Sequence, residues 1–132
     1  MDYQELIRKA EEVKQNAYAP YSNFRVGAAL LTKSGKVYTG CNVESASYSP
    51  TICAESSAIV KAVSEGEQDF VAVAVTSDSE DYTSPCGVCR QRIFEFGSDI
   101  DVIMANKNGD YKVYKISELL PEGFNRDSLM KG

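Results

Sequence analysis

The stretch DFVAVAVTS, residues 69–77, is apolar without interruption through its centre. A run of this kind is typical of a strand that is buried on both faces of a sheet. Helical patterns flank it along the chain: CAESSAIVKAVSEG (53–66) precedes it and ends at a glycine, and CGVCRQRIFEFG (86–97) follows it behind Pro85. We therefore predict a central strand between two helices.

Two pairs of strand patterns lie farther out along the chain. FRVGAALLT (24–32) and KVYTGCNV (36–43) flank a polar turn that contains Gly35, and together they predict a β-hairpin. DIDVIMAN (99–106) and YKVYKI (111–116) are separated by another polar turn and predict two more strands. With the central stretch, the chain carries five predicted strands.

The amino-terminal segment predicts a further helix. It carries apolar residues at helical spacing, has Asp2 and Glu5 placed as a capping pair, and ends before Pro20. Residues 116–124 suggest a short helical turn followed by a tail. Helices interleaved with strands in this way favour an α/β fold, a three-layer α-β-α sandwich around a five-stranded mixed sheet.

Length and composition set the class of protein to expect. A chain of 132 residues with 43% hydrophobic content suits one globular domain, residues 1–132. No stretch is apolar over the length needed to cross a bilayer, and the start of the chain lacks the basic and apolar regions of a signal peptide. Because the cytosol keeps thiols reduced, the four cysteines are expected to be thiols or metal ligands of a cytoplasmic protein.

Charge and the absence of one residue type narrow the function. A net charge of −5 argues against a nucleic-acid partner, whose phosphates are usually neutralised by lysine and arginine, and suits a small neutral substrate better. The chain has no histidine, which excludes Ser-His-Asp and Cys-His catalysis, two-histidine zinc sites and histidine general bases. Any metal must therefore bind to cysteine and carboxylate.

Two short motifs supply such ligands, each at the start of a predicted helix. They are Cys53-Ala54-Glu55 and Ser84-Pro85-Cys86-Gly87-Val88-Cys89. Cys86 and Cys89 are three residues apart, so on a first helical turn both sulfurs project to one side and can bind one ion. Cys53 can supply a third thiolate. Two helix amino termini around the ion would favour thiolate over thiol.

Three protein ligands on tetrahedral zinc leave the fourth position for water, which is the mark of a catalytic site. Glu55 lies two residues after Cys53, which is about 200° around a helix, so we do not expect it to share the metal as a ligand on the same face. It is better placed as a base that takes a proton from the water and returns it to a reacting ring. The motifs therefore predict one catalytic zinc ion and hydrolytic chemistry.

Simpler interpretations exist for each motif. An isolated CxxC pair is most often a redox pair, half of a structural zinc knuckle or merely buried. A structural zinc site with four sulfurs would need Cys41, which lies in a strand pattern beside Gly40 and is expected to be a small core residue. Taken without the cysteines, Glu55 would be an ordinary acidic residue in the first turn of a helix.

At these residues the sequence resembles the cytidine deaminase family, specifically its small homotetrameric branch with three cysteine ligands. The resemblance covers nearly the whole chain. It runs through YAPYS (18–22), FRVGAAL (24–30), NVE (42–44), CAE (53–55), PCGVCRQ (85–91) and ELLP (118–121).

The resemblance implies hydrolysis of cytidine or deoxycytidine to the uracil nucleoside and ammonia in pyrimidine salvage, with Glu55 protonating N3 and then the departing amine. It implies that Asn42 and Glu44 hold ribose hydroxyls, that Phe24 packs against the base, and that backbone groups of Ala54 and Ser84 contact the base. It also implies that Ala46, Tyr48 and Phe124 act across a subunit interface. Without the metal motif, Phe24 would be read as core and Asn42 as a turn residue.

One position departs from the family pattern. Many members carry arginine after Cys-Ala-Glu, where it donates to the metal thiolates, and here the residue is Ser56. Zinc with three thiolates has a formal charge of −1, which must be offset if a water beside it is to become acidic. The helix amino termini, the Ser56 hydroxyl and Arg90 are the candidates for this role.

Three rival functions remain open from the sequence. A blasticidin S deaminase shares the cysteine and glutamate motifs and also lacks the arginine, although Glu44 matches the ribose-binding position of the nucleoside enzymes. A structural zinc domain that binds a partner protein would have four sulfurs on the metal. A nucleic-acid editing deaminase is disfavoured by the acidic charge.

Overall fold

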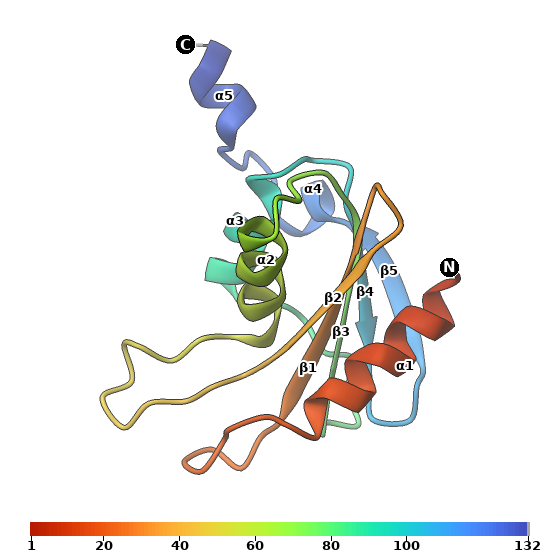
Figure 1. Cartoon of the computed structure of the whole chain (residues 1–132), viewed down its shortest axis with the longest axis vertical. Coiled ribbons are helices and arrows are strands. Elements are labelled where there is room, and N and C mark those ends of the chain that lie inside the picture. Colours follow the sequence, from red (N-terminus) through yellow and green to blue (C-terminus); the bar gives the residue numbers. More distant parts are fainter. Residues whose placement is uncertain (132) are drawn as a thin grey trace.

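The computed structural model describes residues 1–131 and contains one mixed sheet of five strands in the order β2-β1-β3-β4-β5 (Figure 1). β1 pairs antiparallel with β2 and β3, β3 pairs parallel with β4, and β4 pairs antiparallel with β5. The predicted mixed sheet, its central strand, the hairpin of β1 and β2 and the two further strands are therefore confirmed. The strands are β1 (Val26–Thr32), β2 (Val37–Cys41), β3 (Phe70–Ser77), β4 (Asp101–Ala105) and β5 (Tyr111–Lys115).

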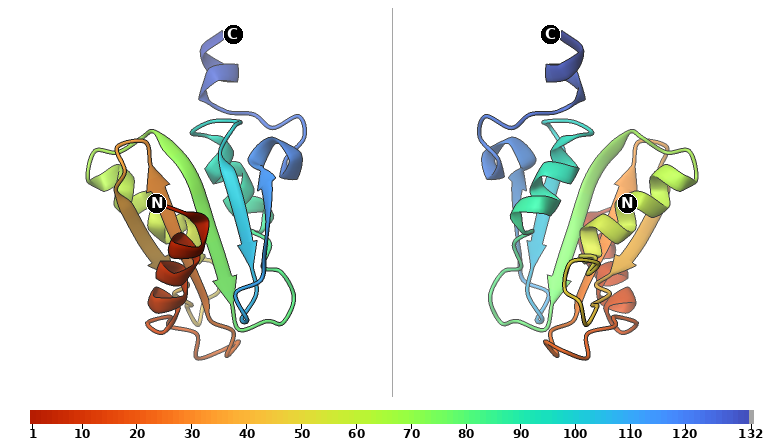
Figure 2. Two further views of the ribbon diagram at one scale, coloured as in Figure 1. Left: turned by 90° about the vertical axis from the view of Figure 1, so that its right-hand side faces the viewer. Right: turned by 90° about the vertical axis from the view of Figure 1, so that its left-hand side faces the viewer.

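Helices cover both faces of this sheet, as the sequence predicts (Figures 1 and 2). The helix α1 (Tyr3–Lys14) lies on one face, where Leu6 and Ala10 pack with Ala74 and Ile103. The helices α2 (Ala54–Ser64) and α3 (Gly87–Phe94) lie on the other, where their buried residues pack with Leu30, Val73 and Val102. The three-layer α-β-α sandwich is confirmed.

Two glycines allow the helices to lie close against the sheet. A Cβ atom at Gly27 would lie 2.0 Å from the carbonyl oxygen of Ala10 in α1. A Cβ atom at Gly40 would lie 2.5 Å from the backbone nitrogen of Ala58 in α2 and 2.6 Å from the carbonyl oxygen of Ala54. Such contacts are far shorter than packed carbon atoms allow, so Gly40 in particular lets the first turn of α2 rest on β2.

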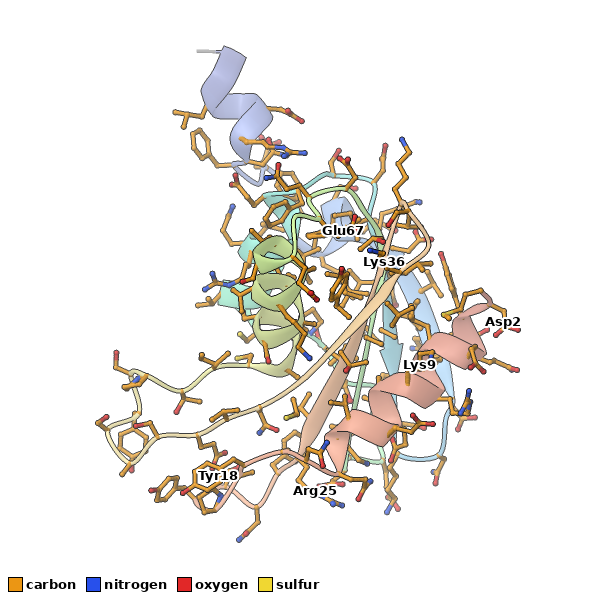
Figure 3. All side chains as sticks on the ribbon, viewed as in Figure 1. Asp2, Lys9, Tyr18, Arg25, Lys36 and Glu67 are labelled. Atoms are coloured by element: carbon orange, nitrogen blue, oxygen red, sulfur yellow. The ribbon has the colours of Figure 1, made fainter. Side chains whose placement is uncertain are left out.

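The amino-terminal helix begins as predicted and ends earlier. The Asp2 carboxylate caps α1 by accepting a hydrogen bond from the Glu5 N–H at 2.8 Å. After Lys14 the chain leaves the helix because Tyr18 pairs with the segment that follows β2: its N–H donates to the Asn42 carbonyl, and its carbonyl accepts from the Glu44 N–H. Figure 3 labels Asp2 at the start of α1 and Tyr18 in the following loop.

The carboxyl-terminal region differs from the prediction. The short helical turn is present as α4 (Ile116–Leu119), but the segment predicted as a tail contains a second helix, α5 (Arg126–Lys131), which stands away from the sheet at the end of the chain (Figure 1). Six residues without an apolar repeat give too weak a pattern for sequence analysis to find. None of the helices in the described part of the chain could cross a membrane.

Candidate active site

Three cysteines meet where the amino termini of α2 and α3 come together. Cys53 and Cys86 each occupy the residue immediately before a helix, and Cys89 lies in the first turn of α3. The three Sγ atoms all lie within 4.8 Å of one another, and those of Cys53 and Cys86 are 3.7 Å apart. The sequence motifs that were expected to converge therefore do so in the fold.

This geometry fits a tetrahedral metal ion. Two sulfurs that are each about 2.3 Å from a tetrahedral zinc ion should lie about 3.8 Å apart. The thiols are already coupled: the hydrogen bond from Cys89 lowers the pKa of Cys53, and the same pairing raises the pKa of Cys89. The free N–H groups of two helix amino termini surround the sulfurs and favour negative charge on them. The trio can hold zinc as thiolates.

Cys41 lies outside this group. It sits on β2 opposite Gly27, and within residues 1–131 the group of ligand atoms close enough to bind a metal contains Cys53, Cys86 and Cys89 alone. The expectation that Cys41 is a core residue is wrong, because its position on the edge strand leaves it partly exposed. A fourth protein sulfur is therefore not available from this strand.

Glu55 lies beside the thiols and is almost fully buried, with 4% of its surface exposed. Burial raises the pKa of its carboxyl group, and a hydrogen bond with Cys89 acts in the opposite direction. A raised pKa suits a group that must both accept and release a proton. Its second place in α2, after Ala54, sets the carboxylate in the wall of a cavity and not in the sulfur cluster.

A cavity of about 210 Å³ opens in front of Glu55. Its walls combine the sequence-predicted residues Phe24, Asn42, Ala54 and Ser84 with two of the cysteines. Four further residues line it that sequence analysis did not single out, namely Val26, Thr51, Ile52 and Thr83. Most of these lie in loops or at strand ends, and of the four only Val26 falls within a stretch of the family resemblance.

The side chain of Asn42 fixes one wall of this cavity. Its Oδ1 accepts a hydrogen bond from the Val26 N–H at 2.9 Å, and its Nδ2 donates to the Phe24 carbonyl at 2.9 Å. Next to Phe24, the Arg25 guanidinium forms a two-point ion pair with Asp78, which lowers the pKa of that carboxyl to about 2. Phe24 is thus held from both sides, and its ring remains 41% exposed.

A second hollow adjoins the first and shares Thr51 with it. Its lining includes Glu44 and Tyr48. The Glu44 carboxylate accepts hydrogen bonds from the Tyr21 and Ser22 N–H groups at 3.0 and 3.1 Å and from the Ser22 hydroxyl, and this last bond lowers the pKa of Glu44. An ionised carboxylate therefore stands next to the cavity.

The structure does not bring every predicted residue to these hollows. Tyr48 lines the second hollow but is 81% exposed, whereas Ala46 is exposed and is absent from the described residues that line the two hollows. Phe124 is 59% exposed on the segment before α5, where its carbonyl accepts a hydrogen bond from the Gln91 side chain. The three residues predicted to act across an interface are thus exposed on the single chain.

Comparison with known proteins agrees with this site. Residues 1–105 match the family model described as the cytidine and deoxycytidylate deaminase zinc-binding region. The cytidine deaminase of Halalkalibacterium halodurans is 47% identical over 130 residues, covering 98% of each chain. The chain belongs to the cytidine deaminase family. The matched region is a zinc-binding one, in accord with the three convergent thiols.

Other cytidine deaminases are similar over a comparable length. That of Sporosarcina psychrophila is 45% identical over 130 residues, covering 98% of this chain and 96% of the relative. The crystal structure of the cytidine deaminase from Burkholderia pseudomallei superposes with a TM-score of 0.91 at 44% identity, covering 94% of this chain and all of the other. A blasticidin-S deaminase of Bacillus cereus is more distant, at 34% identity over 131 residues.

Within this cytidine deaminase fold, the hydrogen bonds of Arg90 do not go to the three clustered cysteines. Its guanidinium donates to the carbonyl oxygens of Pro85 and Leu119, each at 2.9 Å, and to the Ser84 hydroxyl at 2.6 Å. It therefore ties the loop before α3 to α4 and holds Ser84 in the cavity wall. Of the two side chains that could replace the family arginine, Ser56 is the one that reaches a cysteine, with its Oγ 3.3 Å from the Cys89 Sγ.

Proposed function

We propose that this chain is a zinc-dependent enzyme that hydrolyses cytidine and deoxycytidine to uridine and deoxyuridine with release of ammonia. The observation that carries the proposal is the trio of thiols within 4.8 Å of one another beside a buried glutamate at one cavity. Neither a cysteine redox pair nor a structural zinc knuckle needs a buried carboxyl group beside its sulfurs. Membership of the cytidine deaminase family supports the same reaction.

In this proposal Cys53, Cys86 and Cys89 bind one zinc ion per subunit. Bound zinc supplies the Lewis acidity that makes a water ionisable near neutral pH. Glu55 accepts a proton from that water and delivers it to N3 of the cytosine ring, and the hydroxide left behind forms a C–O bond at C4. Glu55 then carries the proton of the new C4 hydroxyl to the amino group, the C4–N bond breaks and ammonia leaves. The buried position of Glu55 keeps both transfers away from bulk water.

The walls of the cavity suit a pyrimidine nucleoside. Phe24 offers an aromatic face to the base, and the backbone groups of Ala54 and Ser84 can pair with its polar edge. Asn42 lines the cavity and Glu44 lines the adjoining hollow, and in this proposal they bind the sugar hydroxyls. The hydrogen bonds that Asn42 and Glu44 already make leave both side chains ordered before substrate arrives, which reduces the entropy lost on binding.

The charges around the cavity predict selection for a nucleoside over its 5′-phosphate. The described residues that line the two hollows include Glu44 and Glu55 but no lysine or arginine. A phosphate would be repelled, so kcat/KM for CMP is expected to be at least about a hundredfold below that for cytidine. Loss of ultraviolet absorbance together with ammonia release measures kcat/KM for cytidine and for CMP. Equal rates for CMP, or turnover of blasticidin S alone, would contradict the proposal and favour a nucleotide or antibiotic deaminase.

We also infer that the active enzyme is a homotetramer whose cavities are completed by a neighbouring subunit. The three residues that the family resemblance implies act across an interface, Ala46, Tyr48 and Phe124, are all exposed on the single chain. Apolar side chains are exposed at the two hollows, namely Ile52 in the cavity wall and Tyr48 in the adjoining hollow. Large exposed apolar surface of this kind commonly marks an interface.

Light scattering is therefore expected to give four times the chain mass of 14.5 kDa. A complementation assay tests the shared site: Tyr48→Ala and Glu55→Gln subunits, each weakly active alone, should regain activity when refolded together. The hybrid would contain cavities with an intact Glu55 from one chain and an intact Tyr48 from the other. A monomeric mass, or a mixture no more active than the sum of its parts, would exclude the shared cavity.

We propose that the enzyme acts in the cytoplasm, within pyrimidine salvage. Its three proposed ligands must stay reduced to bind zinc, and the cytosol maintains thiols in that state.

A further inference from the structure

Ser56 is buried next to the sulfur cluster. It is the third residue of α2 and has 6% of its surface exposed. Its Oγ lies 3.3 Å from the Sγ of Cys89, which is itself fully buried in the first turn of α3. The contact therefore joins the first turns of the two helices that carry the thiols. A hydroxyl in such a place has little access to solvent water as an alternative partner.

The contact is not the usual arrangement for a serine in a helix. Ser64 lies near the other end of α2, and its hydroxyl donates to the carbonyl oxygen four residues earlier, that of Val60, at 2.6 Å. This local bond is the common choice for helical serine. Ser56 instead points across to Cys89, so its hydroxyl belongs to the sulfur cluster and not to its own helix.

Metal binding would decide which of the two atoms, Ser56 Oγ or Cys89 Sγ, donates the hydrogen bond. A cysteine must lose its proton to bind zinc, and a thiolate can only accept hydrogen bonds. The Ser56 hydroxyl is then the donor and Cys89 the acceptor. Because zinc with three thiolates carries a formal charge of −1, a donor to one sulfur withdraws electron density from the centre. Arg90, the nearby cation, is committed to Ser84, Pro85 and Leu119.

We infer that Ser56 is a positioning residue of the zinc site: its hydroxyl donates to the Cys89 thiolate, holds that sulfur in place and weakens its negative charge. The inference rests on the proposed zinc site, and it goes further by assigning one neutral side chain to the task of stabilising the metal ligands. Loss of the hydroxyl should loosen the metal without removing any ligand.

Release of zinc to a chromogenic chelator tests this in the zinc-loaded wild type and variants. Ser56→Ala is expected to release zinc about tenfold faster, since partners that hold a ligand typically contribute ten- to a hundredfold to metal affinity. Ser57→Ala is the matched control: within residues 1–131 the Ser57 hydroxyl makes no hydrogen bond to the sulfur cluster, so its release rate should match that of the wild type. Ser56→Thr keeps the hydroxyl and should restore slow release.

A spectroscopic measurement separates this role from simple packing. With cobalt in place of zinc, the sulfur-to-metal charge-transfer band should move to longer wavelength in Ser56→Ala, because an unbonded thiolate gives up its electrons more readily. The band should stay in place in Ser57→Ala. If wild type binds no zinc, the proposed function itself fails. If wild type binds zinc and Ser56→Ala keeps both its release rate and its band, the role given to Ser56 is wrong.

Discussion

Glu55→Gln is expected to lower kcat for cytidine by about 10³- to 10⁴-fold, while the zinc content stays at the wild-type level. Glutamine has nearly the same shape as glutamate, so the buried position can accept it without a cavity or a clash. It cannot carry a proton between the water, N3 and the amino group. Since Glu55 is not one of the clustered metal ligands, the thiols should still bind zinc.

Zinc per chain by atomic absorption and single-turnover kinetics with cytidine together measure this effect. Glu65→Gln, an exposed position at the end of the same helix, is the matched control and should leave both quantities unchanged. Zinc loss from Glu55→Gln would mean that the carboxylate is a ligand. Turnover within tenfold of the wild type would mean that another group moves the protons.

The sequence was sufficient for the parts of the fold that depend on local pattern. The apolar run at 69–77 became the central strand β3, and Cys53 and Cys86 stand at helix starts as their motifs predict. These features follow from hydrophobic period and from residue types that begin helices. The hairpin of β1 and β2 followed for the same reason, because a polar turn with Gly35 lies between two β-prone runs.

The walls of the cavity could not be predicted in the same way. Ile52 pairs with Val43 just after β2, and Thr83 follows β3, so both meet Val26 because β1 lies between β2 and β3 in the sheet, an order that no local pattern specifies. The pairing of Ser22 with Glu44 likewise depends on where two loops meet. Both are long-range results of packing.

The structure also suggests a second role for Asn42. Asn42 was expected to bind ribose, and its side chain already bridges Val26 and Phe24 in the folded chain. It can contribute to substrate binding indirectly, by holding the aromatic wall in place. A sequence motif could not predict this second role, because it gives the residue type but not the hydrogen-bond partners of the side chain.

Replacing one of the three clustered cysteines should have a large effect on zinc binding and on turnover. Cys89→Ser is expected to weaken zinc binding on the order of 10²- to 10³-fold and to abolish turnover of cytidine at ordinary zinc concentrations. Structural zinc sites with four ligands bind with about 10–16 kcal/mol, so one thiolate contributes about 3–4 kcal/mol. A serine hydroxyl keeps its proton near neutral pH and is a poor replacement. Competition with a chelator of known affinity measures the change.

Cys41→Ser is the matched control, since it makes the same chemical change on β2, outside the sulfur cluster. It should bind zinc and turn over cytidine like the wild type. Circular dichroism of both variants shows whether the fold survives the change. Equal zinc loss in the two variants would place four sulfurs on the metal, which would close the position that water needs and make the site structural. Loss confined to Cys89→Ser would leave that position open beside Glu55, as hydrolysis requires.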